Sequence, residues 1–145
     1  MNGTVCVDAS LFLSIVFDDP QRANASRLWG DWLAAGTPLV APPLFHAEIT
    51  SVIRLRSYRG ELPPATAHEL LSAGLDSPVE IWSDSAALQP RALDLAALFN
   101  QPKAYDAQYL AVADILGCEL WTADRRLAES VASRLPWVRY VGAAA

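Results

Sequence analysis

The stretch from Tyr105 to Leu127, YDAQYLAVADILGCELWTADRRL, contains a complete helix–strand–helix pattern. Apolar residues follow Asp106 at helical spacing as far as residue 116, and Gly117 is a typical residue to end that helix. Residues 118–122 form a short apolar run typical of a buried strand, and Asp124 opens a second helix. A buried strand between two helices indicates an α/β architecture.

The same alternation continues through the rest of the chain. The predicted strands cover residues 4–7, 38–41, 79–82, 118–122 and 137–141. The predicted helices cover residues 11–17, 20–35, 42–59, 63–73, 87–99, 106–116 and 124–135. Short apolar strands that alternate with helices are typical of a parallel sheet with helices on both faces. We therefore predict a single α/β domain over residues 1–145, with a parallel sheet of four or five strands.

The composition is that of a folded domain. Apolar residues make up 52 % of the 145-residue chain, which argues against disorder. No apolar run reaches the roughly 20 residues of a membrane span, so we expect no membrane association. The first residues lack a basic region and soon reach Asp8, so we expect no secretory signal and a cytoplasmic protein. Cys6 and Cys118 lie in apolar runs without metal-ligand spacing, and we expect both to be buried and reduced.

The charge is unusual for a protein that binds nucleic acid. The formal net charge is −5, and Lys103 is the single lysine, whereas nucleic-acid-binding proteins usually carry an excess of basic residues. Any affinity for phosphate must therefore come from local arginines or from bound cations. An acidic surface also favours a basic protein partner.

Three aspartates lie where ligands collect in parallel α/β sheets. Chemistry in such sheets gathers just beyond the carboxyl ends of the strands. Asp8 directly follows the first predicted strand, Asp124 follows the fourth by one residue, and Asp106 begins the helix that leads into the fourth. Each aspartate also has an ordinary explanation, because aspartate is a preferred residue at the start of a helix.

Glu48 is harder to explain as an ordinary surface residue. In the helix predicted over residues 42–59, the apolar residues Leu44, Val52 and Leu55 share one face, and Glu48 lies in the middle of that stripe. A glutamate on a buried face is rarely tolerated unless it is paired or bound to a cation. Either a cation or a protonated neighbour must compensate it, and we favour the cation.

Mutual repulsion points to the same cation. Carboxylates about 5 Å apart repel by roughly 3 kcal/mol per pair at an effective dielectric constant of 20. Convergence of all four acids would threaten a domain whose stability is on the order of 10 kcal/mol. A divalent cation removes that cost, and oxygen ligands favour Mg²⁺ or Mn²⁺ over zinc.

Three segments resemble PIN-domain nucleases, and within them the VapC toxins of bacterial toxin–antitoxin pairs. They are VCVDAS at Val5–Ser10, APPLFHAEITSVIRLR at Ala41–Arg56, and the stretch at Tyr105–Leu127 quoted above. The combination is specific because the order, the spacing and the chain length all match, and the resemblance covers nearly the whole sequence. It implies a single PIN-like nuclease domain.

The resemblance also implies a set of site residues. Asp8, Glu48, Asp106 and Asp124 would hold Mg²⁺, with Mn²⁺ as a substitute, and would direct the hydrolysis of RNA phosphodiester bonds by one or two metal ions. Ser10 and Thr122 would orient a carboxylate or a metal-bound water. Their ordinary alternatives are a helix cap for Ser10 and a strand-favouring residue for Thr122.

The partners implied by the resemblance are an RNA substrate, often tRNA or rRNA, a cognate VapB-like antitoxin with a basic or aromatic tail, and a second copy in a homodimer. The candidate RNA-binding residues are Arg54, Arg56, Arg59, Arg125 and Arg126, each of which is otherwise a solvated surface charge.

Three other functions compete with a toxin ribonuclease. The first is a PIN-type nuclease of RNA processing without a toxin role. The second is a phosphatase or phosphotransfer domain, which is disfavoured because residue 10 is Ser and Lys103 precedes Asp106 rather than following a late strand. The third is a non-catalytic interaction module whose acids only cap helices, and it would gain no stability from Mg²⁺.

Overall fold

The computed structural model describes residues 3–144 and contains one five-stranded parallel sheet. Its strands are β1 (Val5–Val7), β2 (Leu39–Ala41), β3 (Val79–Ile81), β4 (Glu119–Thr122) and β5 (Val138–Tyr140). They lie in the order β3-β2-β1-β4-β5, and every neighbouring pair is parallel. The predicted α/β class, the parallel sheet and all five strands are confirmed.

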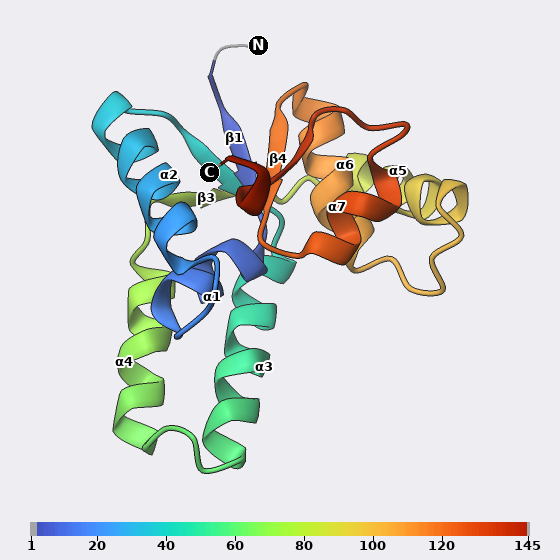
Figure 1. The fold of residues 1–145 in the computed structure, drawn as a ribbon. Coiled ribbons are helices and arrows are strands. Elements are labelled where there is room, and N and C mark those ends of the chain that lie inside the picture. Colours follow the sequence, from blue (N-terminus) through green and yellow to red (C-terminus); the bar gives the residue numbers. More distant parts are fainter. Residues whose placement is uncertain (1–2, 145) are drawn as a thin grey trace.

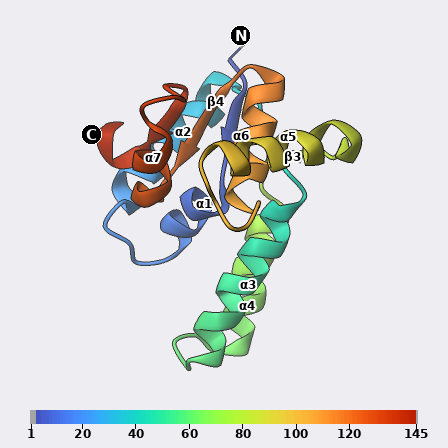
Figure 2. The same ribbon diagram turned by 90° about the vertical axis from the view of Figure 1, so that its right-hand side faces the viewer.

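The described residues also form seven α-helices. They are α1 (Ala9–Val16), α2 (Arg22–Ala35), α3 (Leu44–Tyr58), α4 (Pro64–Leu75), α5 (Ser85–Leu98), α6 (Asp106–Leu116) and α7 (Arg125–Val131), followed by the 3₁₀ helix η1 (Val141–Ala144). In Figure 1, α1 and α2 lie on one side of the sheet, whereas α5, α6 and α7 lie on the other. The pair α3–α4 forms a hairpin that projects away from the sheet in both views (Figures 1 and 2).

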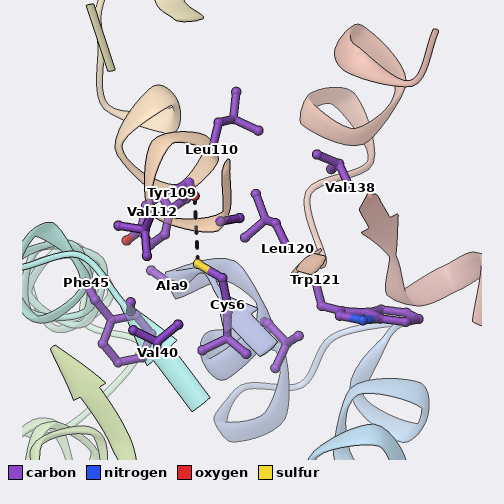
Figure 3. Packing of buried hydrophobic residues seen from close by; sticks show 14 of the residues in the cluster. Cys6, Ala9, Val40, Phe45, Tyr109, Leu110, Val112, Leu120, Trp121 and Val138 are labelled. Atoms are coloured by element: carbon purple, nitrogen blue, oxygen red, sulfur yellow. Dashed lines mark hydrogen bonds between the residues drawn. The ribbon is translucent and has the colours of Figure 1, made fainter. Parts of the chain in front are cut away.

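The core is built around the central strands. β1 is buried along its whole length, as expected for a short apolar strand with helices on both faces. The thiol of Cys6 lies 3.8 Å from the backbone oxygen of Tyr109, which joins β1 to α6 in the middle of this core (Figure 3). Cys6 and Cys118 are both buried and free, as predicted.

Glycines end two helices in the predicted places. Gly36 and Gly117 adopt left-handed backbone conformations with φ of 69° and 64°, and their amides bond to carbonyls of the preceding turn. A left-handed residue turns the chain out of the helix, and glycine does so without steric cost. Among residues 3–144, no helix is long and apolar enough to cross a membrane.

The strand order places the site between β1 and β4. The chain adds β2 and β3 on one side of β1, then crosses back to add β4 and β5 on the other. The residues that follow β1 and β4 therefore face each other across the point where the order of strands reverses. Ligands in open α/β sheets bind at this point.

Candidate active site

Asp8 lies directly after β1 and is buried, with 5 % of its surface exposed. Its carboxylate accepts hydrogen bonds from the Ser10 hydroxyl at 2.6 Å, the Thr122 hydroxyl at 2.5 Å and the Leu11 amide at 3.1 Å. Burial raises the pKa of Asp8 to about 7, although these three hydrogen bonds lower it, and the charge of Asp124 raises it further. Burial therefore destabilises the ionised form of Asp8, and the three hydrogen bonds offset part of that effect.

Ser10 and Thr122 tie the segment after β1 to the segment after β4. The two hydroxyl oxygens lie 3.2 Å apart. Ser10 Oγ accepts from the Ala123 amide at 3.0 Å, and Thr122 Oγ1 accepts from the Asp124 amide at 2.9 Å. Both hydroxyls therefore contact the carboxylate of Asp8 as well as the segment after β4. Ser10 lies within the first turn of α1, and its hydroxyl does not cap that helix.

Two of the three aspartates also cap helices. Asp8 accepts from the Leu11 amide at the start of α1, and Asp124 accepts from the Leu127 amide at the start of α7. Asp106 is not a cap, because it is the first residue of α6 and Tyr105 occupies the cap position. The capping explanation thus applies to Asp8 and Asp124, and Asp106 lacks it.

Glu48 accepts a 2.5 Å hydrogen bond from the hydroxyl of Tyr109, which lies on α6. Tyr109 is 2 % exposed, and burial raises its pKa, as does the nearby charge of Glu48. Burial also raises the pKa of Glu48, the Tyr109 hydrogen bond lowers it, and the charge of Asp106 raises it. A charge-assisted hydrogen bond from a buried phenol thus holds Glu48 in place.

The buried apolar face predicted for α3, with Glu48 at its centre, is wrong. The buried residues of this helix are Phe45, Ile49 and Ile53, whereas Leu55 is 44 % exposed. Glu48 therefore lies at the edge of the buried face and not at its centre. The apolar residues on both faces of α3 follow helical spacing, so spacing alone did not distinguish them.

The four carboxylates form an electrostatic series. The charge of Asp124 raises the pKa of both Asp8 and Asp106, and the charge of Asp106 raises that of Glu48. Burial is the largest cause of the raised pKa of Asp106, and the charge of Arg126 opposes it. In residues 3–144, no three His, Cys, Asp or Glu side chains already stand close enough to form a ready metal cage.

The donor set nevertheless fits a divalent cation. All four side chains offer oxygen, which Mg²⁺ and Mn²⁺ prefer. Three of the acids have raised pKa values because burial disfavours their ionised forms and because a neighbouring acid's charge adds to that effect. Added positive charge at this point relieves both the burial and the mutual repulsion.

Comparison with known proteins agrees with this geometry. The family model of the PIN domain matches residues 5–132. A VapC ribonuclease of Mycobacterium bovis and ribonuclease VapC9 of Mycobacterium tuberculosis are each 30 % identical to the chain over 132 residues, covering 91 % of it and 94 % of the relative. The chain is a VapC-type member of the PIN-domain family. It is therefore an endoribonuclease of the toxin–antitoxin type, and dependence on a divalent metal is typical of its family.

A solved structure shows the same fold. The crystal structure of Mycobacterium tuberculosis VapC20, described in its title as a toxin that cleaves the sarcin-ricin loop, has a TM-score of 0.63 and 19 % sequence identity. The match covers 88 % of this chain and 95 % of VapC20. At this identity the likeness supports the PIN fold alone.

The five candidate RNA-binding arginines of this VapC-type protein lie in different places. Arg126 on α7 lines a cavity with Glu48 and Asp106. Arg125 pairs with Glu129 at 2.9 Å. The remaining three lie at the distal end of α3 and just beyond it, at least six residues or about 9 Å along the helix from Glu48; they are Arg54, Arg56 and Arg59.

Two of the three distal arginines already have other contacts. The guanidinium of Arg54 lies 5.5 Å from the ring centroid of Tyr58, and that of Arg56 lies 4.3 Å from the ring centroid of Phe17. Arg56 also pairs with Glu61 at 3.4 Å. Of the five candidate arginines, only Arg126 lines the cavity beside Glu48 and Asp106.

Tyr109 is the contact that sequence reasoning missed. It lies three residues after Asp106, so the two side chains occupy neighbouring positions on one face of α6. That spacing was visible in the sequence, but nothing in the sequence showed that α3 approaches this face.

Proposed function

We propose that this VapC-type ribonuclease cleaves RNA with Mg²⁺, or Mn²⁺ in its place, held by Asp8, Glu48, Asp106 and Asp124. The observation that supports this site is the group of acids at the point where the strand order reverses, three of which have pKa values raised first by burial and further by a neighbouring acid's charge. Isolated helix caps would not share one electrostatic field. A bound metal would polarise the phosphodiester and activate the attacking water.

The chain itself positions and tunes the ligands. Ser10 and Thr122 hold the carboxylate of Asp8 from both oxygens, and Tyr109 holds that of Glu48. These neighbours favour the ionised acids, which are the forms that bind metal. Arg126 places a positive charge beside Asp106, where an anionic phosphate must approach.

The decisive test is cleavage of RNA by the purified protein with Mg²⁺ or Mn²⁺. We expect Asp106→Asn to lower the rate by at least about 100-fold, since it removes the charge of a metal ligand. Asp114→Asn is a matched control on the same helix, because Asp114 pairs with Arg91 at 2.5 Å and does not line the cavity beside Asp106. Equal cleavage by the wild type and both variants would contradict the proposed site.

The remaining proposals concern partners and location. We propose a cytoplasmic protein that acts on tRNA or rRNA and is neutralised by a VapB-like antitoxin, whose basic tail is favoured by the net charge of −5. We also propose a homodimer. Sedimentation of the purified protein tests the dimer. Loss of cell growth that a co-expressed antitoxin restores tests the toxin role.

A further inference from the structure

A cavity of about 450 Å³ lies beside Glu48 and Asp106, within the usual size range of ligand pockets. Its other walls come from residues 101–105, which join α5 to α6, and from α7. The mechanism above uses the two carboxylates and Arg126 but not the rest of this lining. The unassigned side chains of interest are Gln101, Lys103 and Tyr105.

Two cationic side chains of the lining form no ion pair within the described residues. Lys103 and Arg126 are both exposed, and neither lies within 4 Å of a carboxylate in the part of the chain that the structure describes. Arg125, next to Arg126, is instead paired with Glu129. The two free cations can each meet a phosphate without first breaking an ion pair.

Tyr105 supplies an exposed aromatic ring at the same cavity. It is 59 % exposed and directly precedes Asp106, so the start of α6 fixes its backbone. An exposed aromatic ring beside free cations is the usual combination for binding unpaired nucleotides, whose bases stack on such rings. A base within a duplex has both faces covered and cannot stack in this way.

Gln101 adds an unsatisfied polar group. Its side-chain oxygen Oε1 is buried and has no hydrogen-bond partner among residues 3–144. The backbone is held in place, since the Gln101 amide donates to the Ala96 carbonyl at 2.8 Å and the preceding Asn100 has a left-handed φ of 52°. A buried acceptor without a donor destabilises the folded protein. A ligand that gives the Gln101 side-chain amide a hydrogen-bond partner in the cavity therefore removes that penalty.

We propose that this cavity binds the unpaired nucleotide next to the cleaved phosphodiester. Tyr105 stacks on its base, and Lys103 and Arg126 contact its phosphates. The side-chain amide of Gln101 hydrogen-bonds to the base edge. The inference rests on the proposed nuclease function, and it assigns base preference to residues outside the metal site.

The first test measures binding without cleavage. Labelled single-stranded RNA of randomised sequence is titrated with the protein in EDTA, and fluorescence anisotropy gives the Kd. Tyr105→Ala should weaken binding by about 5- to 150-fold, the range expected for one stacked base. Tyr58→Ala is the matched control, because Tyr58 is 74 % exposed at the far end of α3 and should leave the Kd unchanged. Duplex RNA should bind more weakly than the single strand.

The second test sequences the ends produced from the randomised RNA with Mg²⁺. Gln101→Met keeps the side-chain length, and we expect cleavage to persist while the base preference beside the cut is lost. Lys103→Ala should make binding less dependent on salt, whereas Arg134→Ala, outside the cavity, should not.

The two proposals fail in different ways. Equal Kd values for the wild type, Tyr105→Ala and Tyr58→Ala, or an unchanged base preference in Gln101→Met, would overturn the nucleotide site while cleavage continues. If the wild type binds as expected but no RNA is cut with either metal, the proposed metal-dependent cleavage fails and the binding site stands.

Discussion

The hydroxyl of Tyr109 is the one contact through which α6 holds Glu48 in the described hydrogen bonds, and its removal tests the proposed site. Tyr109→Phe keeps the ring in the core and removes the donor that Glu48 accepts. We expect metal affinity to fall by about 10- to 100-fold, the usual cost of losing an outer-shell partner. The Mg²⁺ concentration that gives half-maximal cleavage measures the change, and Mn²⁺ titration calorimetry checks it independently.

The stability of Tyr109→Phe must be measured as a control, because a change in folding could also weaken metal binding. Thermal unfolding without metal should change little compared with the loss of affinity, since the packing atoms remain. If Tyr109→Phe and the wild type require the same Mg²⁺ concentration, the Tyr109 hydroxyl has no role in positioning Glu48.

Asp8 makes stability depend on pH. Its pKa rises from 3.8 to about 7 on folding, so the folded state binds the proton more tightly than the unfolded state. This preference adds its whole contribution to the free energy of unfolding below the unfolded pKa of 3.8, and that contribution is lost as the pH rises through about 7. The change is on the order of 4 kcal/mol. Urea unfolding in EDTA from about pH 4 to about pH 8 should show this decline.

Asp8→Asn is the control for the pH dependence. Asparagine does not titrate, so the variant should lose most of the decline over the same range. A wild-type protein whose free energy of unfolding stays constant from about pH 4 to about pH 8 would contradict the raised pKa of Asp8.

The four candidate acids could be proposed from sequence because their positions follow from local structure. Asp8 and Asp124 come just after strands, and the parallel arrangement brings the ends of strands together. The contacts of Tyr109 and Gln101 depend on how α3 and the segment before α6 pack in three dimensions. Helical spacing did not provide that information.

Elements were easier to predict than their limits. All five strands lie where short apolar runs indicated them, but α7 ends at Val131 rather than near residue 135. The predicted limit was wrong because Leu127, Val131 and Leu135 are all buried at helical spacing. A turn after the helix, with the Leu135 amide bonded to the Val131 carbonyl at 2.9 Å, continues that spacing.

Two glycines in different elements should respond oppositely to alanine. Gly117 ends α6 with φ of 64°, and an added Cβ meets no atom within 4 Å, so backbone strain alone decides the outcome. Gly117→Ala should destabilise the protein by about 1 kcal/mol. Gly30 lies inside α2 with equally open surroundings, so Gly30→Ala should stabilise it by about 0.5–1 kcal/mol. Urea unfolding measures both variants.

The opposite signs make this pair informative. Both substitutions add the same methyl group in open space, so a shared packing effect cannot produce them. Destabilisation by both variants would mean that α2 does not have the helical backbone described for residue 30.

The whole molecule should be stabilised by the metal it binds. A cation that binds only the folded state stabilises it by about 2.7 kcal/mol at 100 times its Kd. We expect Mg²⁺ to raise the free energy of unfolding of the wild type and to have little effect on Asp106→Asn. NaCl at matched ionic strength controls for general screening of the net charge of −5. A non-catalytic module would show no specific gain with Mg²⁺.

Because β1 and β4 are neighbours in the sheet but far apart in the sequence, the site is completed late in translation. Asp8 is translated early, but its partners Thr122 and Asp124 come more than a hundred residues later. A ribosome that stops before residue 122 therefore releases a chain in which the pocket around Asp8 is incomplete. RNA cleavage at this site then requires a chain that extends past Thr122 and Asp124.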